Sequence, residues 1–360
     1  ERSTNTMQIL TEALGMTLPG SSTIPAVFTD KIVSCRHMGA RIVQMVYEDL
    51  RPSKIMTREA LENAIRMDLA IGGSTNAVLH IPALANELRI DLTADEFEKF
   101  NRSTPCIANV RPSGIYAVDD LHFAGGVPQL FKQLESLVHK ECLNVNGQTL
   151  GEILEHVKDA PNDVIRTVNN PICKDGGLSI LKGNLAPNGS VIRSSTIKES
   201  MQHFRGTAKV YSSDSEAHKA IINEDVKPGD VVVVRYVGPV GAPGMVEIME
   251  ATEAIVNLGL DESVSLITDG RFSGFCHGPI IGHVSPEAAN GGPIALVEDG
   301  DIIEIDIPNR SLKLEVSNKE LARRREKLVL PEPRVKKGFM RTYALNCLPP
   351  ERGAAMQKWD

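Results

Sequence analysis

The chain has 360 residues, of which 42% are hydrophobic and 24% are charged, and this composition is typical of a soluble globular protein with one to three domains. Its formal net charge of −7 argues against a general nucleic-acid-binding protein, and no apolar run reaches the length of a membrane span. The six cysteines are scattered without a CxxC pair, which indicates a reduced compartment such as the cytoplasm, or the stroma or matrix of an organelle in a eukaryote.

The first part of the chain, up to about residue 165, reads as helices with short connections. Leu61, Ile65 and Leu69 lie on one helical face. Thr57 is the expected N-cap of this helix, and two glycines at 72–73 are its expected stop. Further amphipathic helices are expected at residues 94–102 and 127–140.

The pattern changes near Gly176, where strand-length runs rich in Val and Ile alternate with Gly, Pro, Asn and Asp. The runs cover residues 230–238, 264–270 and 292–318. Within the last run, apolar and polar residues alternate over 299–307 and again over 309–316, as in a β-hairpin. Regularly spaced strands of this kind predict a small barrel or sandwich in the second half of the chain.

Four stretches combine glycines with isolated polar residues, and this combination favours a close approach of the backbone to something bound. They are residues 72–80, 176–190, 238–255 and 265–278. In the first, Ser74, Thr75 and Asn76 either cap a helix whose N-terminus binds a carboxylate or phosphate, or form an ordinary turn between helices.

The last two of these stretches each contain a charged residue. Glu247 is expected early in a helix, either as a charge that complements the helix dipole or as a ligand of a hard cation such as Mg²⁺. Asp269 and Gly270 are expected to turn the chain after a short strand. Arg271 and Ser273 then follow, either in a decorated turn or in a binding site.

Long motifs in this chain resemble, in order, the dihydroxy-acid dehydratase and sugar-acid dehydratase family of iron–sulfur hydro-lyases. The stretch LITDGRFSG at 266–274 is similar to the C-terminal signature of that family. The other matching stretches are residues 3–22, 72–80, 176–187, 242–249 and 282–325. The resemblance therefore covers essentially the whole chain.

The resemblance implies the removal of water from a 2,3-dihydroxy acid to give a 2-oxo acid. It implies an iron–sulfur cluster, [2Fe-2S] or [4Fe-4S], that binds the leaving 3-hydroxyl, and a Mg²⁺ that holds the carboxylate and 2-hydroxyl. Carried over by position, Ser273 is the base that takes the proton from C2, and Glu247 is a Mg²⁺ ligand. The residues expected to bind substrate are Gly73, Ser74, Thr75, Asn76 and Arg271.

The family's three cluster cysteines and its other Mg²⁺ ligands match positions upstream of residue 1, so no iron–sulfur ligand is expected in this chain. We therefore expect the chain to correspond to the C-terminal two-thirds of such an enzyme and to be inactive alone. The expected fold is α/β: residues 1–165 form an α/β domain without its N-terminal part, 175–330 form a β-barrel-like, swivelling domain, and 331–360 form a C-terminal tail.

The leading interpretation is a dihydroxy-acid dehydratase of branched-chain amino acid (valine and isoleucine) biosynthesis. An aldonate dehydratase that acts on a sugar acid is the alternative within the class, and a non-catalytic fragment that serves as a binding or scaffold subunit is the alternative outside it. The expected partners are the small dihydroxy acid and a second copy of the chain in a homodimer, without nucleic acid or membrane. The site is expected between the two domains.

Overall fold

The computed structural model describes residues 3–272 and 278–357, and the chain divides into two compact units. The first unit comprises Glu1–Ala77, Glu87–Asp91 and Phe97–Gly177. The second comprises Val78–Asn86, Leu92–Glu96 and Leu178–Asp360. The domain limits expected from the sequence remain a prediction.

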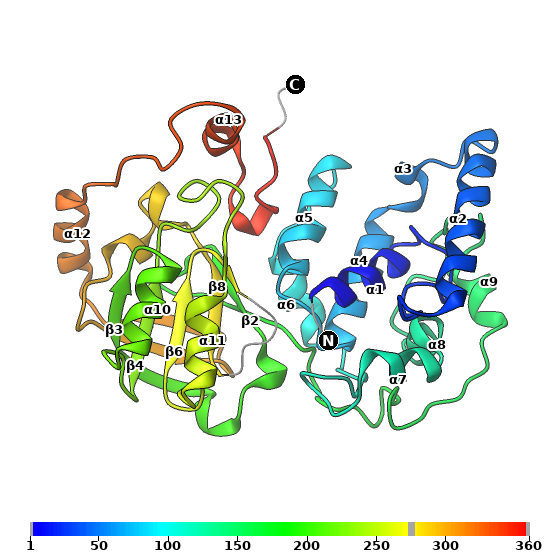
Figure 1. The fold of residues 1–360 in the computed structure, drawn as a ribbon, viewed down its shortest axis with the longest axis horizontal. Coiled ribbons are helices and arrows are strands. Elements are labelled where there is room, and N and C mark those ends of the chain that lie inside the picture. The colour runs from blue at the N-terminus through cyan, green and yellow to red at the C-terminus, as the bar shows by residue number, and fades with distance from the viewer. Residues whose placement is uncertain (1–2, 273–277, 358–360) are drawn as a thin grey trace. The chain divides into compact units, whose positions relative to one another are not determined.

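The first unit is built from helices around α4, Arg58–Ala70 (Figure 1). Thr57 accepts a hydrogen bond from the backbone N–H of Ala60, which confirms the expected N-cap. Leu61, Ile65 and Leu69 are fully buried, as the helical spacing predicted. The other helices are α1 (Ser3–Ala13), α2 (Thr29–Tyr47), α3 (Pro52–Ile55), α7 (Val118–Phe123), α8 (Gly126–Gln133) and α9 (Leu150–Glu155). Helix α6 (Asp95–Asn101) begins in the second unit and continues into the first from Phe97.

A nearly closed, barrel-like sheet of eight strands forms the centre of the second unit, in the order β1-β2-β8-β6-β4-β3-β9-β10. Strands β3, β4, β6 and β8 are parallel neighbours, and the flanking pairs are antiparallel. The strands are β1 (Ser179–Leu181), β2 (Gly189–Ile192), β3 (His203–Tyr211), β4 (Asp230–Val234), β6 (Ser265–Thr268), β8 (Ile280–Ser285), β9 (Ile302–Asp306) and β10 (Ser311–Leu314). The expected mixed α/β fold with a β-barrel-like second half is confirmed, and so is the β9–β10 hairpin.

Backbone contacts at Lys182 bring the two ends of this sheet together. The Lys182 N–H donates to the Arg310 carbonyl at 2.9 Å, and the Leu312 N–H donates to the Lys182 carbonyl at 2.9 Å. The residue after β1 therefore pairs with β10, the last strand of the sheet.

Both faces of the parallel strands are buried, which explains why β4 is an unbroken run of valines. Val231 and Val233 pack into the barrel interior, in the same cluster as Ile267. Val232 and Val234 face the opposite way, into a cluster that includes residues of α10 (Asp214–Ile222) and α11 (Glu250–Asn257).

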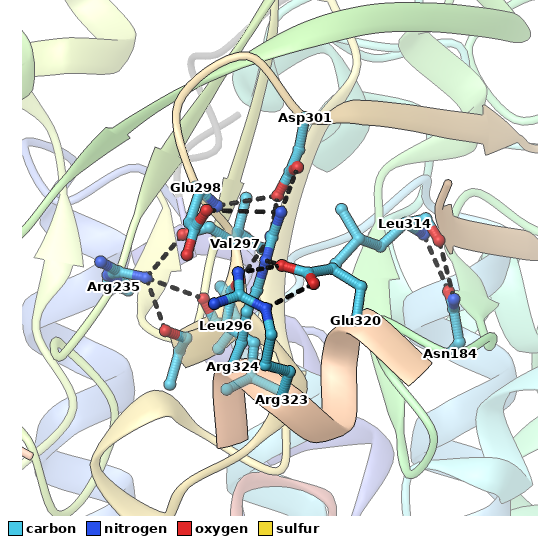
Figure 2. A network of polar contacts seen from close by, with 12 residues as sticks. Asn184, Arg235, Leu296, Val297, Glu298, Asp301, Leu314, Glu320, Arg323 and Arg324 are labelled. Carbon is cyan, nitrogen blue, oxygen red and sulfur yellow. Dashed lines mark hydrogen bonds and ion pairs between the residues drawn. The ribbon is translucent and has the colours of Figure 1, made fainter. Parts of the chain in front are cut away.

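The basic helix α12, Asn318–Lys327, is anchored by Arg324 (Figure 2). The guanidinium of Arg324 donates to Asp301 and to the Leu296 carbonyl, and both charged side chains are about nine-tenths buried. Apart from the Arg324 side chain, most of the surface of α12 is exposed to solvent. Residues after it include α13 (Phe339–Asn346). Among the described residues, no helix is both long and apolar enough to span a membrane.

Candidate active site

A two-stranded parallel sheet brings Glu247 and Arg271 side by side. Strand β5 is Glu247–Ile248, strand β7 is Arg271–Phe272, and their register pairs Glu247 with Arg271. The two residues are 24 positions apart in the sequence, and each was expected at a binding site for a separate reason. The structure therefore joins a half-buried carboxylate and a guanidinium-bearing residue at one place in the second unit.

The expectation that Glu247 lies early in a helix is wrong, because α11 begins only at Glu250. The strand forms because the Val246 carbonyl accepts the Arg271 N–H at 2.9 Å. At the start of α11 the backbone N–H groups of residues 249–251 donate to the carboxylate of Asp214 at 2.9–3.1 Å. Asp214 thus satisfies the helix N-terminus, and Glu247 is not needed for that role.

His80 and His283, for which the sequence predicted no role, lie close enough to Arg271 for its charge to affect their pKa values. His80 belongs to α5 (Ala77–Glu87), and His283 belongs to β8. Burial and the positive charge of Arg271 lower the pKa of both imidazoles, that of His283 to about 3. His283 is therefore neutral at pH 7, and it can donate or accept a hydrogen bond without adding charge.

The backbone at His283 is irregular in a way that redirects its side chain. The β2–β8 register shifts here, because Gly189 pairs with Ser285 and Val191 pairs with Gly282, which leaves one extra residue in β8. His283 has a φ of 56°, in the left-handed region that non-glycine residues rarely adopt. Both its ring nitrogens are buried and have no hydrogen-bond partner among the described residues, and such groups usually bind a water or a ligand.

Two acidic side chains, Asp269 and Glu287, are buried at the ends of β6 and β8, with exposed fractions of 0% and 1%. Burial raises the pKa of Asp269, and burial together with the nearby Asp269 charge raises that of Glu287 to about 7. Hydrogen bonds from backbone N–H groups oppose both shifts. From the sequence, Asp269 was expected only as a turn residue, and no role was predicted for Glu287.

A cavity of about 570 Å³ opens beyond the carboxyl ends of β3 and β4, where ligands of parallel sheets commonly bind. Arg334 and Arg341 from the C-terminal tail line it, and Val240 and Gly241 form part of its wall. The carboxylates of Glu216 and Glu332 also line the cavity, so the formal charges of its lining balance.

The predicted substrate-binding turn Gly73–Asn76 belongs to the first unit, whereas the site residues described above belong to the second. Ser74, Thr75 and Asn76 are at most 3% exposed. The Ser74 N–H donates to the carboxylate of Asp68 at 3.0 Å. A Cβ atom at Gly73 would lie 1.9 Å from Asp68 Oδ1, so this close approach requires glycine. That the turn meets Glu247 and Ser273 remains a prediction.

Ser273, the predicted base, lies outside the described residues, and so does Cys276. The structure reaches Phe272, the second residue of β7, and resumes at Gly278. The role assigned to Ser273 therefore remains a prediction, and it rests on the family resemblance.

Two family profiles match this chain in sequence. Residues 3–153 match the N-terminal domain of the dihydroxy-acid/6-phosphogluconate dehydratases, and residues 163–354 match their C-terminal domain. The chain belongs to this dehydratase family. The earlier resemblance is thus confirmed at the level of the family.

Curated relatives of this family are similar over nearly the whole chain. A dihydroxy-acid dehydratase of Ignicoccus hospitalis is 50% identical over 358 residues, which is 98% of this chain and 64% of the relative. One of Caldanaerobacter subterraneus subsp. tengcongensis is 46% identical over 98% of this chain and 64% of the relative. One of Syntrophotalea carbinolica is 49% identical over 94% of this chain and 61% of the relative. The chain thus spans a little under two-thirds of the relatives' length.

The described cysteines do not fit an iron–sulfur cluster. No group of three His, Cys, Asp or Glu side chains that could hold a metal ion occurs in residues 3–272 and 278–357. For Mg²⁺, Glu247 supplies one carboxylate, which is a suitable ligand but not a complete site.

Proposed function

We propose that the complete protein is a dihydroxy-acid dehydratase that converts a 2,3-dihydroxy carboxylic acid into a 2-oxo acid and water. The printed names of the curated relatives support this reaction. In this chain the proposal is carried by the register of β5 and β7, which pairs Glu247 with Arg271 two residues before Ser273. The branched substrates of valine and isoleucine synthesis are the preferred ones.

The residues of the second unit have distinct roles in this proposal. Glu247 would provide one ligand of a Mg²⁺ ion, and the charge of that ion would favour binding of an anionic substrate. Arg271 adds positive charge beside it, which favours an anionic substrate. Ser273 removes the proton from C2, for which its hydroxyl must first be activated by neighbouring positive charge or N–H donors.

In this proposal Gly73, Ser74, Thr75 and Asn76 of the first unit are substrate-binding residues. Their backbone is held by Asp68, which makes the turn a preformed element. The iron–sulfur cluster is a cofactor of the complete protein in this proposal. Since the described cysteines do not fit it, no catalytic step is assigned here to a cluster bound by this chain.

The test is steady-state formation of 2-oxo acid by full-length protein, with iron, sulfide and Mg²⁺ content measured in the same preparation. 2,3-Dihydroxy-3-methylbutanoate and gluconate are compared as substrates. We expect turnover of the first and little of the second. Preference for gluconate would support the aldonate dehydratase, and a protein with a full cluster but no turnover of either would support the non-catalytic alternative. The 360-residue chain alone is expected to be inactive.

We also propose that the full-length protein is a homodimer in the cytoplasm, or in an organelle stroma or matrix. The support is the family resemblance, together with apolar side chains exposed along α2, such as Ile42, Val46 and Tyr47. A monomer in light scattering at micromolar concentration, or a membrane-bound fraction after cell lysis, would contradict these two statements.

A further inference from the structure

The loop from Tyr236 to Val246, which joins β4 to β5, has a backbone that needs support. Tyr236 and Met245 have φ values of 64° and 59°, in the left-handed region that costs non-glycine residues free energy. On one side the loop borders the 570 Å³ cavity, at Tyr236, Val240 and Gly241. Packing on that side is therefore incomplete, and other contacts must fix the loop.

Asp269 holds the beginning of the loop. Its carboxylate accepts the N–H groups of Tyr236 at 3.1 Å and Val237 at 3.0 Å, and also that of Ala288 at 2.8 Å. Because Asp269 lies two residues before Arg271, it joins the start of this loop to the segment that carries the guanidinium.

Glu287 holds the middle of the loop. Its carboxylate accepts the N–H groups of Val240 at 2.9 Å and Gly241 at 2.9 Å. A Cβ atom at Gly238 would lie 2.6 Å from Glu287 Oε2, so the loop backbone packs directly on this side chain and the position requires glycine. Five backbone N–H groups thus donate to two buried carboxylates.

The end of the loop is fixed to Arg271 itself. Arg271 Nε donates to the Met245 carbonyl at 2.9 Å, and the Arg271 N–H donates to the Val246 carbonyl at 2.9 Å. A displacement of the loop would therefore change where Glu247 stands relative to Arg271.

Two buried carboxylates are costly, because burial disfavours their charged forms. Apolar side chains of similar size would avoid this cost, but they would leave the five N–H groups without acceptors. The two buried carboxylates are therefore explained by the backbone N–H groups that they bind.

We propose that Asp269 and Glu287 are positioning residues that hold the Tyr236–Val246 loop so that Glu247 stands beside Arg271 for metal and substrate binding. The proposal rests on the function proposed above for the metal and substrate. Whether the two carboxylates hold the loop does not depend on that function. A test of the loop can therefore succeed or fail independently of a test of the proposed reaction.

The first test is amide hydrogen exchange of the full-length wild-type protein and its Glu287→Gln variant. In the wild type, Val240 and Gly241 are expected to exchange slowly, as amides of β4 do. In Glu287→Gln they exchange about tenfold faster, because one carboxylate oxygen is replaced by an NH₂ donor that faces the Val240 N–H. Asp306→Asn is the matched control: it removes a largely buried carboxylate that accepts the Asn309 N–H, at the amino-terminal end of β3.

The second test compares kcat with the Mg²⁺ concentration that gives half-maximal rate. For Glu287→Gln and Asp269→Asn, that concentration should rise about tenfold, while kcat at saturating Mg²⁺ changes less than about threefold. Glu287→Asp should recover part of the loss. Asp306→Asn should change neither quantity.

Unprotected Val240 and Gly241 amides in the wild type would overturn the proposal, and this arm does not require a variant to fold. Unchanged exchange in Glu287→Gln, or a loss of kcat with no change in Mg²⁺ dependence, would also overturn it. If the wild type forms no 2-oxo acid, the proposed function fails, and the exchange data still decide whether the two carboxylates hold the loop.

Discussion

Replacing Glu287 with Gln should change how the free energy of unfolding depends on pH. Burial raises the pKa of this carboxyl from its usual value of about 4.5 to about 7 in the folded protein. The folded state therefore binds the proton more tightly than the unfolded state. The resulting stability is fully present below about pH 4.5 and is lost as the pH rises through about 7.

The size of this effect follows from the shift. A difference of about two and a half pKa units corresponds to about 3–4 kcal/mol at about 1.4 kcal/mol per unit. Asp269 lies close by, and burial raises its pKa too, so its titration changes stability in the same direction. Tyr343 and Cys347 also face Glu287, and burial raises the pKa of both side chains. Because these three groups interact electrostatically with Glu287, the difference between the two proteins reports the titration of Glu287 together with its coupling to them.

The assay is urea unfolding of both proteins at half-unit steps from pH 4.5 to 8, followed by far-ultraviolet circular dichroism. The wild-type free energy of unfolding should fall relative to that of Glu287→Gln by about 3 kcal/mol across this range. The variant is expected to be less stable than the wild type at pH 5 and to approach or exceed it at pH 8. Parallel pH profiles for the two proteins would refute the reasoning.

Three further substitutions test the site. Ser273→Ala should lower kcat of the full-length enzyme by about 10²–10⁴-fold with unchanged iron content, and near-normal turnover would reject it as the base. Glu247→Gln should weaken Mg²⁺ binding, measured by calorimetry, and added Mg²⁺ should restore part of the rate; an unaltered affinity would remove Glu247 from the metal site. Gly73→Ala should destabilise the first unit by about 1–3 kcal/mol in thermal unfolding, because its Cβ would lie 1.9 Å from Asp68 Oδ1. An unchanged melting temperature would mean that Asp68 moves at no cost.

Elements whose signals are local in the sequence were predicted well. The β9–β10 hairpin follows from the alternation of apolar and polar residues across a short turn, and the α4 N-cap follows from Thr57 and the spacing after it. The barrel follows from the number and spacing of such strands. Each of these features depends mainly on residues that are close neighbours in the chain.

The details of the candidate site depend on partners far away in the sequence, so they could not be predicted from local pattern. Glu247 was expected in a helix, but its pairing with Arg271 places it in a strand, and the cap from Asp214 places the helix start after it. Both are contacts between segments that are distant in the sequence, so the local pattern around Glu247 does not reveal them. Glu287 gives no local signal, since a Glu after a Pro resembles an ordinary turn residue. His283 lies in a strand pattern that does not reveal its bulge.

The backbone contact at Lys182 affects when the sheet of the second unit can close during synthesis of the chain. Exposed strand edges are sites where chains pair with one another and aggregate, and a sheet that meets its own far edge leaves less of them open. The pairing joins residues next to the first and last strands, so closure must wait until Ser311–Leu314 has left the ribosome. A nascent chain that stalls before this segment would present an uncovered β1 edge to its neighbours, and premature truncation should lead to insoluble product rather than to a smaller barrel.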